Sequence, residues 1–274
     1  MKTILVVANE TLGGAALLER LREHAAADDV RVAICVPRTR PRHGNIIYDE
    51  AVYDAAQVRI DLARSVLREE GIDSVGEPGD PDPYTATMDA VAEYHPDHVI
   101  ISTYPATSSG WLRRDLIERV ADASGVPVEH VVADIEREGL PFGVTLVVAN
   151  RTAASTALHE ALKAKADHDG RHLFVVVVPQ EGGEGLHIRR ARGRLSQVID
   201  RLRNDGMLAA GMIGDPDPYT ATMNALQFFR VDDVVISTLP ETRSGWLRAD
   251  LVERVRKASG KPVDHVAAEQ PTAA

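Results

Sequence analysis

Short apolar runs without regular polar alternation recur along the first half of the chain. They lie at residues 3–8, 30–36, 98–103 and 126–132, with a weaker run at 72–78. Unbroken apolar runs of this length are typical of strands that are buried on both faces, as in a parallel sheet covered by helices. The pattern therefore predicts five strands of a covered parallel sheet.

Between these runs, apolar residues recur at the spacing of three to four that is typical of helices. The predicted helices span residues 13–25, 50–70, 83–94 and 110–123. The resulting order is βαβαβαβαβ, which right-handed crossovers wind into a five-stranded parallel sheet with helices on both faces. The predicted fold class is α/β of the Rossmann-like type.

The same pattern occurs twice along the chain. Gly79 to Met88 recurs letter for letter at Gly214 to Met223, 135 residues later. Leu5 to Asn9 recurs as Leu146 to Asn150, at an offset of 141. Periods of this length exceed the 20 to 50 residues of stacking repeats, so each copy is predicted to be a domain.

Two domains also agree with the chain length of 274 residues. We place the first domain at residues 1–134 and the second at 142–269, with the charged segment Asp134 to Pro141 as the linker. Each domain is long enough to bury a core of its own.

Composition excludes several classes of protein. The formal net charge of -10 repels phosphate backbones and anionic lipids, so a nucleic-acid partner and a membrane partner are not expected. The only cysteine, Cys35, lies within an apolar run, as expected of a core residue in a reducing cytoplasm. Apolar stretches such as Phe174 to Val178 are far shorter than a membrane helix requires.

Doubly wound sheets bind ligands beyond the carboxyl ends of their strands, beside the first strand. This rule directs attention to the loops after the first, third and fourth strands of each copy. The candidate ligand-binding residues are Asn9, Thr11, Asp80, Ser102, Thr103, Thr107, Ser109, Gly110 and Arg113 in the first copy, and Asn150, Thr152, Asp215, Ser237, Thr238, Thr242, Arg243, Ser244, Gly245 and Arg248 in the second.

Three features together resemble the universal stress protein family: a first strand that ends in a polar pair, a Gly-Asp-Pro before the third helix, and a polar loop after the fourth strand. The resemblance covers nearly the whole chain, twice. It implies two adenine nucleotide alpha hydrolase-like domains, and ATP or AMP as the ligand. Many members bind ATP through a loop of the form Gly-x2-Gly-x9-Gly-Ser/Thr, in which amides and a hydroxyl hold the phosphates.

The corresponding loops depart from that form. One glycine remains in each, Gly110 and Gly245, and Asp115 and Asp250 stand where the terminal hydroxyl of the motif aligns. A carboxylate at this position repels phosphate oxygens. The loops therefore predict, at most, weak binding of nucleotides or other anions.

Several of these residues have a structural interpretation as well as a functional one. Ser109 and Ser244 either cap the fourth helix or contribute hydroxyls to an anion site. Trp111 and Trp246 either pack on the core or stack on a base. The arginines at positions 189, 190, 192 and 194 are typical of a solvated helix face.

Two other motifs have a simpler interpretation. Asp82-Pro83, repeated at Asp217-Pro218, is typical of a helix N-cap followed by proline. His98 follows His95 by three residues, but the second copy has Asp233 in its place. No metal site is therefore expected from the histidines.

The chain contains no nucleophile elbow and no complete phosphate loop, so an enzyme is not the leading hypothesis. The residues favour a non-catalytic stress-response module of the universal stress type, cytoplasmic, that senses a ligand or binds a partner protein. The alternatives are a slow nucleotide hydrolase and a scaffold without a small ligand. The resemblance also implies an intramolecular pseudo-dimer through strands 126–132 and 261–267, with His130 and His265 near its axis.

Overall fold

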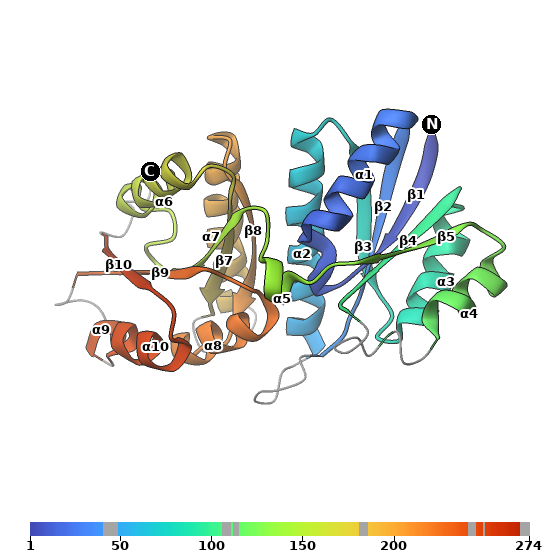
Figure 1. Ribbon diagram of the computed structural model, residues 1–274. Coiled ribbons are helices and arrows are strands. Elements are labelled where there is room, and N and C mark those ends of the chain that lie inside the picture. Colours follow the sequence, from blue (N-terminus) through green and yellow to red (C-terminus); the bar gives the residue numbers. More distant parts are fainter. Residues whose placement is uncertain are drawn as a thin grey trace. The chain divides into compact units, whose positions relative to one another are not determined.

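A computed structural model describes residues 1–40, 49–105, 111, 115–180, 186–240, 245–248 and 250–268, apart from the side chains at 169, 186, 187, 247 and 248. The chain divides into two compact units. Unit 1 comprises Met1–Arg40 and Arg59–Pro141, and unit 2 comprises Pro41–Val58 and Phe142–Ala274. Each unit contains one five-stranded parallel sheet flanked by helices (Figure 1).

The elements of the first repeat alternate between strand and helix, as the sequence predicts. They are β1 (Lys2–Val7), the 3-10 helix η1 (Glu10–Gly13), α1 (Ala15–Ala27), β2 (Val30–Pro37), α2 (Asp49–Glu69), β3 (Asp73–Gly79), α3 (Pro83–Tyr94), β4 (His98–Thr103), α4 (Leu116–Ser124) and β5 (Val128–Val132). A short helix, α5 (Ile135–Glu138), lies within the segment predicted to be a linker. Asp134 caps it by accepting a hydrogen bond from the Arg137 amide.

The second repeat has the same order of elements. They are β6 (Gly143–Val148), α6 (Thr156–Asp169), β7 (His172–Pro179), α7 (Leu186–Asn204), β8 (Leu208–Gly214), α8 (Pro218–Phe228), β9 (Asp233–Thr238), α9 (Gly245–Arg248), α10 (Leu251–Ser259) and β10 (Val263–Ala267). Within the described residues, no helix combines the length and the apolar character that crossing a membrane requires.

Strand order confirms the predicted fold class. The order is β3-β2-β1-β4-β5 in unit 1 and β8-β7-β6-β9-β10 in unit 2, and every pairing is parallel. The first strand of each repeat therefore lies at the centre of its sheet, with the second strand on one side and the fourth on the other. In a doubly wound sheet, the order in which the strands are added reverses at this point, between the first and the fourth strand.

The predicted start of the fourth helix is wrong. We expected a helix over 110–123 that includes Asp115, but α4 begins at Leu116. Asp115 has a φ of 49°, and Asp250, at the equivalent place before α10, has a φ of 48°. Residues with side chains rarely adopt this left-handed conformation, and a helix cannot pass through it. Both aspartates therefore lie at the N-cap position and not within the helix.

Each sheet is buried on both faces. In unit 1, one face packs against α3 and α4 through a cluster that includes Val7, Cys35, Ala90 and Leu116. The strand residues of the opposite face, such as Ile34, are equally buried. Because alternate strand residues point to opposite faces, both layers of helices are needed to keep these runs away from water.

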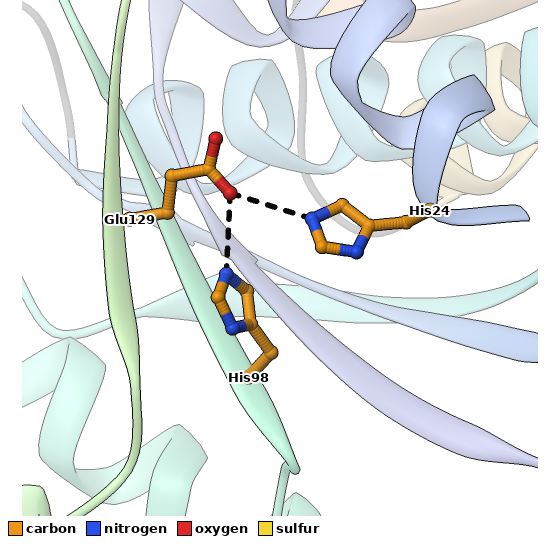
Figure 2. Close-up of side chains that lie close together, drawn as sticks. All are labelled: His24, His98 and Glu129. Atoms are coloured by element: carbon orange, nitrogen blue, oxygen red, sulfur yellow. Dashed lines mark hydrogen bonds and ion pairs between the residues drawn. The ribbon is translucent and has the colours of Figure 1, made fainter. Parts of the chain in front are cut away.

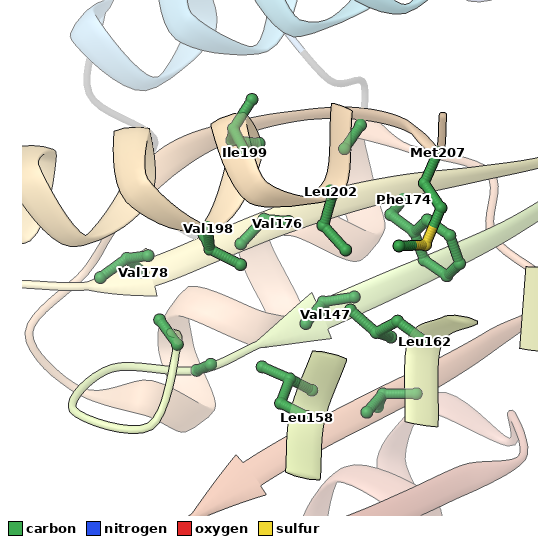
Figure 3. Close-up of a cluster of buried hydrophobic side chains, with 14 of the residues drawn as sticks. Val147, Leu158, Leu162, Phe174, Val176, Val178, Val198, Ile199, Leu202 and Met207 are labelled. Carbon is green, nitrogen blue, oxygen red and sulfur yellow. The ribbon is translucent and has the colours of Figure 1, made fainter. Parts of the chain in front are cut away.

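The core of unit 2 shows how one helical layer seals a sheet. Phe174 is fully buried in β7, next to Met207, and belongs to one cluster with Val198 and Leu202 of α7 (Figure 3). Leu158 and Leu162 of α6 belong to the same cluster. Burial of a side chain as large as Phe174 contributes about 2 to 3 kcal/mol.

The glycine of each Gly-Asp-Pro motif allows a strand to approach a helix closely. A Cβ atom on Gly79 would lie 2.7 Å from the Cβ of Ala86 in α3 and 2.7 Å from the Sγ of Cys35. A Cβ atom on Gly214 would lie 2.7 Å from the Cβ of Ala221 in α8. Any larger residue would therefore push the helix away from the sheet.

Candidate functional site

The carboxyl ends of β1 and β4 lie side by side in unit 1, and those of β6 and β9 do so in unit 2. At this point the chain leaves neighbouring strands in opposite directions, which is where ligands bind in doubly wound sheets. Four of the predicted residues, Asn9, Thr11, Ser102 and Thr103, lie at this edge of unit 1. Their counterparts at the same edge of unit 2 are Asn150, Thr152, Ser237 and Thr238.

Hydroxyl groups connect the carboxyl end of β4 to η1 and to β5 in unit 1. The Oγ1 of Thr11, in η1, donates a hydrogen bond to the Ser102 carbonyl at 3.0 Å. The Oγ1 of Thr103 donates to the Tyr104 carbonyl at 2.7 Å and lies 2.9 Å from Nε2 of His130. Since that hydroxyl proton is already used, the imidazole nitrogen is the donor in the second bond.

Unit 2 repeats part of this arrangement. The Oγ1 of Thr238 donates to the Leu239 carbonyl at 2.9 Å and lies 2.8 Å from Nε2 of His265. Burial lowers the pKa of His265, as it does for His130, and so favours the neutral ring. The threonine–histidine pair is therefore a feature of both units.

Several buried polar atoms at this edge have no hydrogen-bond partner within the described part of the chain. They are the Oδ1 of Asn9, the Oγ atoms of Ser102 and Ser237, and the Oγ1 of Thr152. The exposed fraction is 1% for each of Ser102, Thr152 and Ser237. A buried polar atom without a partner costs about 1 to 3 kcal/mol, which a bound water or ligand would recover.

One arginine in each unit adds a positive charge close to this edge. Arg59 of α2 and Arg194 of α7 are equivalent, because each precedes the glycine that ends the third strand by 20 residues. In unit 2, Nη1 of Arg194 donates to Oδ1 of Asn150, two residues after β6. The position of Arg194 therefore differs from the solvated helix face that the sequence suggested.

In unit 1, Arg59 is close to a carboxylate and a phenol at the same edge. The Tyr104 hydroxyl donates to Oε2 of Glu10 at 2.9 Å. Burial lowers the pKa of Arg59 to about 10, against the opposing effect of the charges of Glu10 and Tyr104. Sequence reasoning missed Arg59, although its equal spacing from the repeated glycine was a usable signal.

Asp80 and Asp215 have a structural role in their turns. Oδ1 of Asp80 accepts a hydrogen bond from the Asp82 amide at 2.8 Å, and Oδ1 of Asp215 accepts one from the Asp217 amide at the same distance. Asp82 in turn caps α3 through the Thr85 amide, as predicted. The first aspartate of each motif thus holds the amide of the second, and the second holds an amide in the first turn of the helix.

The remaining predicted site residues belong to the loop after the fourth strand. Gly245 begins α9, and Arg248 ends it, with a side chain that lies outside the described residues. Seven others fall wholly outside the described residues: Thr107, Ser109, Gly110, Arg113, Thr242, Arg243 and Ser244. Their proposed contribution to anion binding stays a prediction.

No protein-family model matches the chain, and neither does any curated protein. Among solved structures, it is similar to a universal stress protein from Archaeoglobus fulgidus DSM 4304, with 16% identity, a TM-score of 0.36, and coverage of 97% of this chain and 96% of that chain. It is also similar to a functionally unknown protein from Pseudomonas aeruginosa PAO1, with 15% identity, a TM-score of 0.32, and coverage of 98% and 93%. These values assign neither a family nor a function, so the site is interpreted from its own residues.

Proposed function

We propose that the chain is a non-catalytic ligand-sensing module of the universal stress type. Each unit binds a small anionic ligand, of the class of phosphate or a nucleoside monophosphate, at the carboxyl ends of its first and fourth strands. The interaction is weak, because the loops that would hold a triphosphate lack the glycine pattern that this task requires. A stress-response role and a cytoplasmic location follow from the family resemblance and belong to the proposal.

The observation that carries the proposal is the repeated pair of buried serine hydroxyls. Ser102 is the residue before the last of β4 and Ser237 the equivalent residue of β9, and neither Oγ has a partner within the described residues. If packing were the only role of this residue, alanine would serve as well and would leave no buried hydroxyl without a hydrogen bond. The same unsatisfied hydroxyl in both copies supports a ligand at this place.

The arginines make an anion the best match for these hydroxyls. Oxyanions accept hydrogen bonds from hydroxyl groups and from guanidinium groups, and the latter bonds are the stronger. Arg59 and Arg194 supply such a charge at equivalent positions, although the chain as a whole carries a net charge of -10. A local cation in an acidic protein favours a small anion over an extended polyanion.

Native mass spectrometry of freshly purified chain tests the proposal first, by the mass of any retained anion or nucleotide. Calorimetric titration with phosphate, AMP and ATP then measures affinity. We expect AMP and phosphate to bind to the wild type. The double variant Ser102→Ala with Ser237→Ala should bind them at least about tenfold more weakly, because each site loses a charge-assisted hydrogen bond. Ser196→Ala, on the exposed face of α7, is the matched control and should bind like the wild type.

The outcomes separate the proposal from its alternatives. Absence of binding by every titrant would leave the scaffold reading in place. Hydrolysis of ATP that disappears in Asp80→Asn with Asp215→Asn would favour the hydrolase. The turn role of these two aspartates gives no support to that enzyme.

A further inference from the structure

Three side chains with metal-ligating atoms meet at the opposite, amino edge of the sheet in unit 1. His24 lies in the last turn of α1, His98 is the first residue of β4, and Glu129 is the second residue of β5. Both imidazoles direct Nε2 toward the same carboxylate oxygen of Glu129 (Figure 2). The distances to Oε2 are 3.3 Å from His24 and 3.2 Å from His98.

These distances match those between ligands of one metal ion. Two ligand atoms bound tetrahedrally at the usual length for zinc, about 2.0 Å, are about 3.3 Å apart. All three ligand atoms lie within 4.8 Å of one another. Two histidines with one glutamate form a known type of zinc site that leaves the fourth position to water.

The surroundings hold the carboxylate and leave the cluster accessible. Nε of Arg20 donates to the other oxygen of Glu129, Oε1, at 2.5 Å, which fixes the orientation of Oε2 toward the two rings. Arg20 also pairs with Glu23 at 2.6 Å, which balances part of its charge. The exposed fractions of His24, His98 and Glu129 are 23%, 24% and 22%, so an ion can enter without unfolding the unit.

In unit 2, an ion pair occupies the equivalent place. The equivalents of His24, His98 and Glu129 are Lys165, Asp233 and Asp264, at the offsets of the duplication. The Lys165 ammonium contacts Asp233 and lies 3.9 Å from Asp264. In this copy the charge of the lysine side chain offsets that of the carboxylates. An ammonium group has no lone pair with which to bind a metal ion.

We propose that His24, His98 and Glu129 form a binding site for a single divalent transition-metal ion, with Zn²⁺ as the ion of best fit. In unit 1 the metal ion takes the role that the Lys165 ammonium has in unit 2. The site ties α1 to β4 and β5 and is separate from the carboxyl edge. Two imidazoles and one carboxylate in a partly buried place suit zinc better than magnesium or calcium, which prefer six or more oxygens.

The test uses the full chain without an affinity tag. Equilibrium dialysis against micromolar Zn²⁺, followed by metal analysis, should give one equivalent per chain, and Co²⁺ should give the visible absorption of a four-coordinate site. We expect His24→Gln, His98→Asn and Glu129→Gln each to weaken binding at least about tenfold, since even residues around a metal site have effects of this size. Circular dichroism confirms that each variant is folded.

His95→Asn is the matched control. His95 lies three residues before His98 but caps α3 in a left-handed conformation that asparagine tolerates. This variant should bind zinc like the wild type. Wild-type protein that binds no zinc, or one equivalent that persists in the double variant His24→Gln with His98→Asn, would overturn the proposal and leave a hydrogen-bonded cluster without a metal.

Discussion

Cys35 is a thiol enclosed between the central sheet and α3. Its exposed fraction is 2%, and its Sγ lies 3.5 Å from the Ala86 carbonyl. Burial raises the pKa of Cys35 to about 12, with a further contribution from the charges of Glu77, Asp89 and Glu93. Because the thiolate is the reactive form, the folded protein contains almost none of it at neutral pH.

We therefore expect native protein at pH 8 to react with iodoacetamide at least about a hundredfold more slowly than protein unfolded in guanidinium. Mass spectrometry of the intact chain counts the modified thiols over time. Unfolded protein should gain one label, which serves as the control. Rapid labelling of the native state would show that unit 1 opens readily around β2.

His265 gives unit 2 a dependence on pH. Burial lowers its folded-state pKa below the value of about 6.5 that an unfolded chain has. The unfolded state therefore takes up a proton that the folded state resists, and stability falls as the pH drops below about 6.5, until the folded pKa is passed. Above that window the residue contributes no pH dependence.

Chemical denaturation at pH 7 and pH 5 measures this effect. The wild type should lose stability at pH 5, and His265→Gln should lose less, because its amide can still donate to Thr238 but does not titrate. His168→Gln, at an exposed position, should behave like the wild type. An identical loss in His265→Gln and the wild type would assign the pH dependence to other groups.

At the scale of elements, α3 and α8 start with the same cap. Oδ2 of Asp82 accepts from the Thr85 amide at 3.0 Å, and Oδ2 of Asp217 accepts from the Thr220 amide at 2.9 Å. We expect Asp82→Ala and Asp217→Ala each to lower the free energy of unfolding by about 1 kcal/mol, the usual value of an N-cap. Serine at either position keeps the capping oxygen and should restore most of the loss, as judged by denaturant midpoints.

The elements themselves were predictable because apolar runs and helical spacing are local properties. The strand runs at 30–36 and 98–103 correspond to β2 and β4 within one residue. The start of α4 was not predictable, because nothing in the local pattern shows that Asp115 adopts a positive φ. A left-handed aspartate is set by how the loop packs, and helical periodicity does not encode it.

The candidate sites also differ in how far the sequence predicts them. The hydroxyls at the ends of β1 and β4 could be placed from topology alone, since strand order determines which loops meet. The cluster of His24 and Glu129 could not, because its members lie 105 residues apart and come together only through side-chain packing. Alignment of the two copies shows only that Lys165, Asp233 and Asp264 stand at the equivalent positions; that these positions meet is a finding of the structure.

At the scale of the whole molecule, the two copies preserve the framework and differ in charge. Serine and threonine recur at the carboxyl edge as Ser102-Thr103 and Ser237-Thr238. The residues at the amino edge differ instead, with two histidines in one copy and a lysine in the other. The carboxyl edge is thus shared by the two copies, whereas the charge of the amino edge distinguishes them.

The last prediction concerns how the chain unfolds. Each unit has its own core, so a core mutation should destabilise its own unit most. Phe174→Ala in β7 removes a fully buried ring and should cost unit 2 about 3 to 5 kcal/mol. Val32→Ala, at the equivalent position of β2, removes two methyl groups from unit 1 and should cost about 2 kcal/mol.

Two single-tryptophan backgrounds separate the units, because Trp111 belongs to unit 1 and Trp246 to unit 2. In the Trp111→Phe background, the fluorescence of Trp246 should report a large fall in denaturant midpoint for Phe174→Ala and a smaller one for Val32→Ala. In the Trp246→Phe background, Trp111 should report the reverse order. Equal shifts at both tryptophans for each mutation would contradict the prediction, because the two cores would then unfold as one cooperative structure.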